Sequence, residues 1–242
     1  MKGKRMMMVT ALAGSMALPT MAQDKVEATL GSDFVSSYVW RGQKNGGFSI
    51  QPNASLSYKG LSVGAWGSFA IAPNEKYAGT EEELDITLGY AVKGFHVGIT
   101  DYFLFNNGLP FFKYGSIGKT AHTFEGGIGY DFGFLAIDWF TNFAGTDGVN
   151  KDGKRAYSSY LQLDAPFRLA KLDWNATVGI VPYRTDFYVA DDSHGFHVNT
   201  VSLKAQYTIE FPHFQLPVYG QLIANPSSRD LHYLVGFTVT AL

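Results

Sequence analysis

The segment Ser32-Asp33-Phe34-Val35-Ser36-Ser37-Tyr38-Val39-Trp40-Arg41-Gly42 alternates between two kinds of side chain. Its even positions include the aromatic residues Phe34, Tyr38 and Trp40, and its odd positions include the polar residues Asp33, Ser37 and Arg41. Because successive side chains of a β-strand point to opposite faces, the segment predicts a strand with one apolar and one polar face. We expect this strand to run from about Val26 to Gln43.

The same alternation continues to the end of the chain, in segments separated by turn residues. Helical periodicity is weak, and no segment after residue 22 holds the roughly 18 consecutive apolar residues that a membrane-spanning helix needs. Little sequence remains to cover the apolar faces, so we expect them to contact lipid and the polar faces to line a closed interior. The predicted fold is all-β: a transmembrane antiparallel up-and-down β-barrel of about 12 strands.

The predicted connections alternate in length. Those after the even-numbered strands are short and lie near Lys59-Gly60, Lys93-Gly94, Asp131-Phe132-Gly133, 167–171 and Pro212. Those after the odd-numbered strands are mostly longer, as at 73–80, 106–119, 145–155 and 184–195. Outer-membrane barrels have short periplasmic turns and longer external loops. The pattern therefore favours such a barrel, with both termini on the periplasmic side, over a soluble β-sandwich.

Residues 1–22 have the features of a secretory signal peptide. Lys2, Lys4 and Arg5 form a positive region, a mostly apolar stretch follows, and Thr20-Met21-Ala22 supplies small residues for the peptidase. The apolar stretch is too short to cross a hydrocarbon core about 30 Å thick. We expect residues 1–22 to be cleaved and residues 23–242 to form one barrel in the outer membrane of a Gram-negative-type cell envelope.

The charge of the mature chain is mildly acidic. The whole chain has 19 Lys and Arg against 21 Asp and Glu, and cleavage after residue 22 removes three of the 19, which leaves 16 basic residues and a net charge of −5. This balance argues against a nucleic-acid partner. The chain has no Cys and therefore forms no disulfides.

Aromatic residues gather near both ends of the predicted strands, as in the girdles that outer-membrane barrels place at the two membrane interfaces. The girdle near the short turns is predicted to include Tyr58, Tyr90, Phe95, Tyr130 and Tyr207. The girdle at the opposite rim is predicted to include Trp40, Phe69, Phe103 and Tyr183.

The polar faces carry an excess of acidic side chains. The predicted pore-lining residues are Asp33, Arg41, Glu83, Asp85, Glu125, Asp138, Asp164, Asp173 and Lys204. An open lumen with this balance would favour cations or neutral solutes over anions. Alternatively, the inward charges pair with one another and fill a narrow barrel.

The sequence makes a specific prediction for each of two further charged residues, Arg41 and Asp101. Arg41 is predicted near the outer mouth, at the level of Glu83 and Asp85, as a constriction residue or as one partner of an inter-strand ion pair, and the ion pair is favoured. Asp101 falls on an apolar position of its strand, so we expect a β-bulge that returns it to the lumen.

Three segments carry a resemblance to a known family. They are Phe34-Val35-Ser36-Ser37-Tyr38-Val39-Trp40-Arg41-Gly42, Gly64-Ala65-Trp66-Gly67-Ser68 and Glu83-Leu84-Asp85-Ile86. Through them the chain resembles the Gcw_chp, or TorF-type, family of porin-like outer-membrane proteins. The resemblance implies a signal-bearing outer-membrane barrel without naming a solute or a reaction. The chain departs from such barrels at its end, Thr240-Ala241-Leu242, where an aromatic is usual for the assembly machinery; Phe237 or Tyr233 would serve instead.

The sequence predicts a porin-like passive channel for small neutral or cationic solutes, with outer-membrane lipid and the assembly machinery as further partners. A side-chain-filled barrel that acts through its loops as a structural or surface-interaction protein is the alternative. An outer-membrane hydrolase, in which His96, His122 or His232 meets a Ser, is a third. No GxSxG, Walker or HExxH motif occurs. We assign no catalytic residue, no metal ligand and no cofactor.

Overall fold

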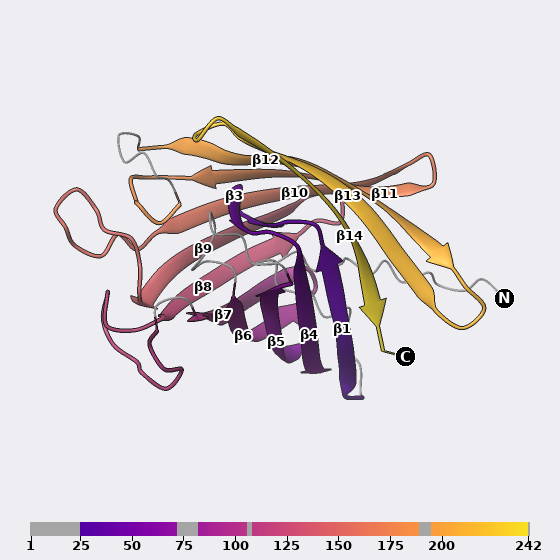
Figure 1. Cartoon of the computed structure of the whole chain (residues 1–242), viewed down its shortest axis with the longest axis horizontal. Helices are drawn as coiled ribbons and strands as arrows, with labels where there is room; N and C mark the ends of the chain where they lie inside the picture. The colour runs from indigo at the N-terminus through magenta and orange to yellow at the C-terminus, as the bar shows by residue number, and fades with distance from the viewer. Residues whose placement is uncertain (1–24, 72–81, 106–107, 189–194, 242) are drawn as a thin grey trace.

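The computed structural model describes residues 25–71, 82–105, 108–188 and 195–241. The predicted signal peptide and the predicted loop at 73–80 lie outside these residues. Fourteen strands are described, and twelve of them form a closed antiparallel barrel (Figure 1). No helix in these residues is long and apolar enough to span a membrane.

The barrel strands follow one another around the wall in chain order. They are β1 (Glu27–Val35), β4 (Ser49–Tyr58), β5 (Leu61–Ala70), β6 (Glu83–Val92), β7 (Phe95–Leu104), β8 (His122–Asp131), β9 (Ala136–Gly145), β10 (Ser159–Leu169), β11 (Leu172–Val181), β12 (His197–Glu210), β13 (Gln215–Asn225) and β14 (Asp230–Thr240). The first and last strands close the wall, from the pair Gly31 and Thr240 to the pair Val35 and Gly236. The predicted up-and-down barrel of about 12 strands is confirmed.

The connections are short at one end of the barrel, which we name the turn end, and mostly longer at the other, the loop end. Lys59-Gly60 and Lys93-Gly94 have φ values of 50° and 86° in both turns, the left-handed conformations of a type I′ hairpin. The connection between β13 and β14 is short although it lies at the loop end. The predicted alternation therefore holds for all the other connections.

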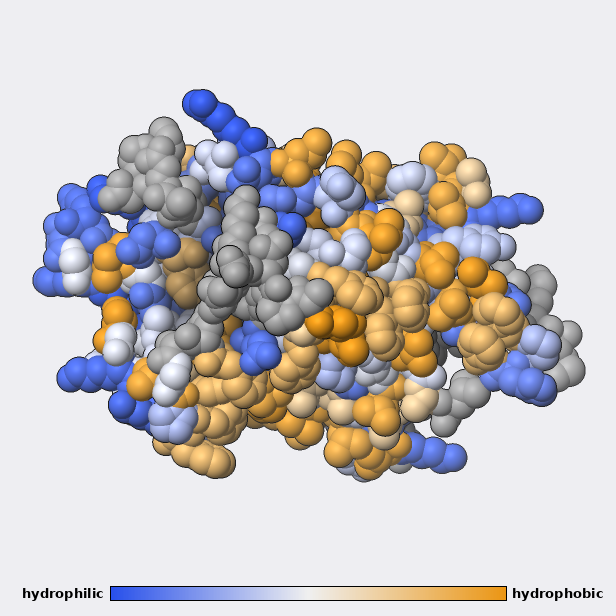
Figure 2. Space-filling view, in the orientation of Figure 1, coloured by the Kyte–Doolittle hydropathy of each residue, from blue (hydrophilic) through white to orange (hydrophobic). Residues whose placement is uncertain are grey.

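The outer wall is apolar. Leu88 of β6 and Ile99 of β7 are cross-strand partners that point outward, with exposed fractions of 54% and 48%. Figure 2 shows apolar side chains gathered over the middle of the wall and hydrophilic ones at both ends of the long axis. A water-soluble monomer rarely exposes apolar surface of this extent, whereas a barrel in a bilayer must do so.

The prediction for the first strand was wrong at its second half. β1 ends at Val35, and the chain then turns inward as a hairpin made of β2 (Tyr38–Trp40) and β3 (Gln43–Gly46). Figure 1 shows this hairpin turned away from the line of β1. Trp40, predicted in the outer girdle, is instead only 8% exposed. The period-2 pattern persists through the turn at Ser36-Ser37 because both segments are β-structure, so it does not record the change of direction.

Candidate functional site: the inserted hairpin and the lumen

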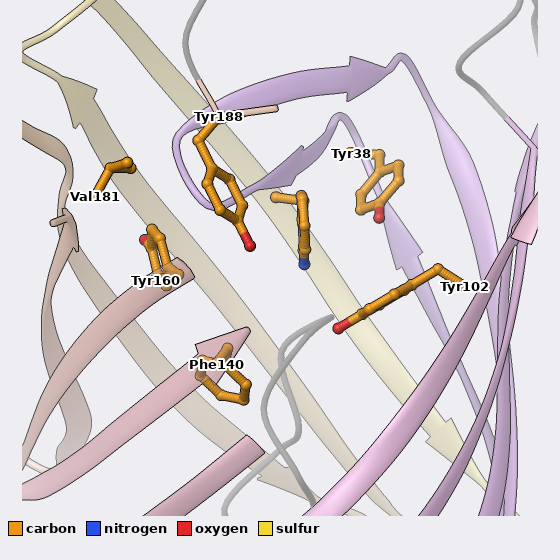
Figure 3. Packing of buried hydrophobic residues seen from close by; sticks show 7 residues of the cluster. Tyr38, Tyr102, Phe140, Tyr160, Val181 and Tyr188 are labelled. Atoms are coloured by element: carbon orange, nitrogen blue, oxygen red, sulfur yellow. The ribbon is translucent and has the colours of Figure 1, made fainter. Parts of the chain in front are cut away.

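The β2–β3 hairpin crosses the interior of the barrel. Tyr38 and Trp40 pack in one buried cluster with Tyr102, Phe140, Tyr160, Val181 and Tyr188. Val39, whose side chain points the other way, packs against Ile223 of β13 and Leu234 of β14. In Figure 3 the labelled side chains of this cluster converge from the hairpin, from the barrel strands and from the segment that carries Tyr188. The hairpin therefore contacts opposite parts of the wall at this level of the lumen.

Arg41 lies at the tip of the hairpin and forms an ion pair with Glu125 of β8. Its Nη1 atom is 2.5 Å from Oε2 and its Nη2 atom 2.9 Å from Oε1, so the pair is bidentate. Both side chains are 2% exposed. The carbon centre of the guanidinium lies 4.4–4.6 Å from the ring centroids of Trp40, Phe140 and Tyr160. A planar guanidinium suits this combination of stacking and bidentate bonding, which a lysine could not reproduce.

Two tyrosines complete the hydrogen bonding of Glu125. The Tyr102 hydroxyl donates to Oε1 at 2.8 Å, and the Tyr188 hydroxyl donates to Oε2 at 3.2 Å while accepting from Arg41 Nη1 at 2.6 Å. Burial would lower the pKa of Arg41, but the Glu125 carboxylate outweighs it and holds that pKa well above its ordinary value. Burial, aided by Glu125, raises the pKa of Tyr188 well above its ordinary value. The cluster therefore contains a permanently charged Arg and a neutral Tyr.

The backbone of the hairpin tip is held by two asparagines. Asn199 Nδ2 donates to the Arg41 carbonyl at 3.0 Å, and Asn225 Nδ2 donates to the Gly42 carbonyl at 3.1 Å. Gly42 has a φ of 76°, and a Cβ there would lie 2.0 Å from the Asn199 carbonyl oxygen. Only glycine fits such a position, so Gly42 allows the tip to approach β12.

Glu83 and Asp85 lie on the inward face of β6, 5% and 7% exposed. The Tyr38 hydroxyl donates to Glu83 Oε2 at 2.7 Å, which ties the hairpin to this strand as well. Asp85 lies between its cross-strand partners Trp66 of β5 and Tyr102 of β7. Its Oδ1 atom is buried without a hydrogen-bond partner. The ion pair expected near these acids is present, but Arg41 bonds to Glu125, two strands away on β8, and not to Glu83 or Asp85.

The other predicted pore-lining residues lie apart from this cluster. Asp33 accepts a hydrogen bond from the Thr238 hydroxyl, and Asp138 is hydrogen-bonded to Nε2 of His96. Oδ1 of Asp173 lies 3.7 Å from Nε of Arg168. Asp164 accepts from Asn175 at 2.8 Å, Thr177 at 2.6 Å and Gln162 at 2.6 Å. Lys204 Nζ lies 3.9 Å from the centroid of the Tyr219 ring. The lining of a conducting pore by these residues stays a prediction.

Seven of the nine predicted girdle residues have exposed side chains. They are Tyr58, Phe69, Tyr90, Phe95, Tyr130, Tyr183 and Tyr207. Trp40 and Phe103 are the exceptions. Trp40 belongs to the inserted hairpin, and Phe103 of β7 is 3% exposed and packs against the ring of His122. Contact of the seven exposed residues with a membrane interface stays a prediction.

The bulge expected at Asp101 does not occur. The register runs without a shift through the pairs of Asp101 with Ile86 and with Phe124, so Asp101 stays on the outer face. Its carboxylate lies 2.8 Å from Nδ1 of His122, and Nε2 of His122 contacts the Phe111 carbonyl. Partnership with a fully buried His, and not a change of register, accommodates the acid there.

Sequence reasoning missed several members of the site, namely Tyr102, Phe140, Tyr160, Tyr188, Asn199 and Asn225. Tyr102, Phe140 and Tyr160 occupy inward positions of strands, where an aromatic among polar side chains was the available signal.

His96 and His122 are hydrogen-bonded to acids and carbonyls, without a serine among the contacts described for them. Among the residues placed by the structure, no group of three His, Cys, Asp or Glu side chains could hold a metal ion.

Comparisons with known proteins identify no family. No model of a protein family matches the chain, and no curated protein matches it. The resemblance to the Gcw_chp or TorF-type family therefore stays a resemblance. Among solved structures, the chain is similar to OmpF of Salmonella typhi in complex with daunomycin, with 12% identity over 90% of this chain and 97% of that one, and a TM-score of 0.38.

Proposed function

We propose that this protein is a porin-like outer-membrane barrel for small neutral or cationic solutes, whose lumen is closed in the state described by its own β2–β3 hairpin. The apolar outer wall supports a location in a membrane. The closure of the barrel supports it too, because a closed barrel satisfies all of its backbone hydrogen bonds within lipid. The short connections would then face the periplasm and the longer ones the exterior.

The observation that carries the proposal is the Arg41–Glu125 ion pair inside the barrel. Both side chains are 2% exposed, so the pair has almost no contact with water. A wide passive pore would leave such charges hydrated. The hairpin also packs against β13 and β14 through Val39. Solute passage therefore requires the hairpin to move.

The inward charges support the choice of solute. Glu83, Asp85 and Glu125 lie near one another at the level of the hairpin, and Arg41 bonds to Glu125 alone of the three. If the hairpin left with Arg41, three acidic side chains would remain on the wall at this level. A lumen with that charge favours cations over anions.

The proposal is tested by removing the hairpin. Val35 and Ser49 are register partners on β1 and β4, so an Asn-Gly turn in place of residues 36–48 would join the two strands directly. In planar bilayers, the refolded full barrel should show little steady conductance, and the hairpin-deleted variant should show steady, cation-selective steps. Arg168→Ala, at the turn end, serves as the matched control and should behave as the full barrel does.

Two outcomes would overturn the proposal. Steady conductance of the full barrel that the deletion does not increase would show that the hairpin closes nothing. A hairpin-deleted variant that is folded, by its circular dichroism and its heat-dependent migration on gels, but silent would show a lumen filled by side chains. The second outcome would favour the structural or surface-interaction protein, which the packed interior also supports.

A further inference from the structure

We infer that Glu83 and Asp85, with Trp66 and Tyr102 on either side, form a binding site for a small organic ammonium cation. The inference deepens the proposed function by naming a solute class, and it relies on that function only for the route to the site. The site itself is argued from contacts on β5, β6 and β7.

The first step concerns charge. Glu83 and Asp85 are two residues apart on one strand, so both side chains point inward, and they are only 5% and 7% exposed. Two carboxyl groups buried on neighbouring positions of one face need a proton or a nearby cation, because two such negative charges repel each other. The one buried Arg of the described residues bonds to Glu125, and none of the described ion pairs includes Glu83 or Asp85.

The second step concerns the unpartnered oxygen. Asp85 is 7% exposed, and its Oδ1 atom has no hydrogen-bond donor. The hydroxyls of Tyr38 and Tyr102 are already in use, since Tyr38 donates to Glu83 and Tyr102 donates to Glu125. A buried carboxylate oxygen without a donor is costly, and an N–H group of a bound ammonium would satisfy it.

The third step concerns the aromatic walls. Trp66 and Tyr102 are the cross-strand partners of Asp85, and the Tyr38 ring lies 5.6 Å from the Trp66 ring, centroid to centroid. Carboxylates with aromatic neighbours suit an alkylated ammonium, which gains cation–π attraction in addition to its ion pair. A strongly hydrated metal ion would gain less from such walls, because it prefers a shell of oxygen ligands.

The fourth step concerns access. Between Asp85 and the turn end of the barrel, the inward positions of β5 and β6 hold Gly64, Thr87 and Gly89. The neighbouring inward positions of β7 and β8 hold Gly98 and Gly127. A Cβ on Gly64 would meet no atom closer than 3.5 Å. On the turn-end side of the acids the inward face therefore carries small side chains. On the loop-end side Tyr38 covers Glu83, so the hairpin limits access from there.

The test measures binding without conductance. Ethylammonium chloride is titrated into the refolded barrel and into the hairpin-deleted variant, at constant ionic strength, and tryptophan fluorescence and calorimetry are recorded. Saturable binding is expected, with affinity reduced at least about tenfold by Asp85→Asn or Glu83→Gln, the loss expected when a charge-assisted contact is removed. Trp66→Phe should remove most of the fluorescence change.

Asp164→Asn is the matched control, because Asp164 is an inward carboxylate whose oxygens already accept three hydrogen bonds. Its affinity for ethylammonium should equal that of the unmodified barrel. Absence of saturable binding in both barrels would overturn the inference and leave a proton between the two acids. Equal responses to ethylammonium and potassium, or unchanged affinity in Asp85→Asn, would overturn it too. A barrel that binds ethylammonium yet stays silent in bilayers without its hairpin would refute the channel alone.

Discussion

Arg41 and Glu125 are 84 positions apart in sequence and form a bidentate ion pair inside the barrel. One partner belongs to an inserted hairpin and the other to the wall, so the pair fixes the hairpin at its tip. Tyr102 and Tyr188 satisfy the remaining lone pairs of the carboxylate. Breaking such a pair by removing one side chain leaves the other charge buried and alone.

Arg41→Ala is therefore expected to lower the free energy of unfolding by about 3–5 kcal/mol, measured by urea unfolding in lipid vesicles. Glu125→Gln should have a similar effect, and the two changes together should cost less than their sum. Arg168→Ala is the control, because Arg168 and Asp173 are 56% and 47% exposed and such pairs contribute about 1 kcal/mol or less. Equal effects of Arg41→Ala and Arg168→Ala would contradict the buried pair.

Gly42→Ala is expected to displace the hairpin tip. The substitution combines a φ of 76° with a Cβ only 2.0 Å from the Asn199 carbonyl oxygen. Gly153→Ala separates the two effects, because Gly153 has a φ of 69° and no atom within 4 Å of its Cβ position. The Gly153 variant should lose about 1–2 kcal/mol of stability in the same urea assay, and the Gly42 variant should lose clearly more. Comparable losses would show that the contact with β12 does not constrain the tip.

The barrel could be predicted from the sequence because its signal is repeated in every strand. Leu84, Ile86 and Leu88 alternate with Glu83, Asp85 and Thr87, and one face must meet lipid while the other cannot. The hairpin could not be predicted in this way. Tyr38, Trp40 and Arg41 continue the alternation of β1, and period 2 describes any strand, whether it lies in the wall or in the lumen.

The partner of Arg41 was equally beyond sequence reasoning. The expected neighbours Glu83 and Asp85 lie at the level of the hairpin, as predicted. Arg41 nevertheless forms its ion pair with Glu125, because the hairpin carries Arg41 across the lumen toward β8. Tyr188 reaches the same cluster from the segment after β11, far from any strand pattern. Asp101 shows a different error. Its place among apolar positions was interpreted as a β-bulge, whereas in the structure Asp101 stays in register and pairs with a buried His on the next strand.

Because the outer wall faces lipid, the loss of unfolding free energy caused by a charged substitution there should depend on its depth in the bilayer. Leu88 lies near the middle of β6 and is 54% exposed on the outer face. Leu88→Arg should cost about 2–4 kcal/mol of unfolding free energy in vesicles, the range for Arg at the bilayer midplane. Phe134→Arg, in a turn and 73% exposed, should cost about 1 kcal/mol or less. A larger cost at Phe134 than at Leu88 would place the membrane at another level of the barrel.

The position of Trp40 can be measured by fluorescence. The chain has four Trp residues, at 40, 66, 139 and 174, and variants that retain one Trp each report its surroundings. Trp139 is 38% exposed on an outward position of β9, whereas Trp40 is 8% exposed in the buried cluster. In vesicles of lipids with brominated acyl chains, fluorescence from Trp139 should be strongly quenched and that from Trp40 nearly unchanged. Quenching of Trp40 as strong as that of Trp139 would instead place it on the outer wall, as the uninterrupted alternation of its segment had predicted. Loss of protection for Trp40 in Arg41→Ala, without a change at Trp139, would show that the ion pair with Glu125 keeps the hairpin inside.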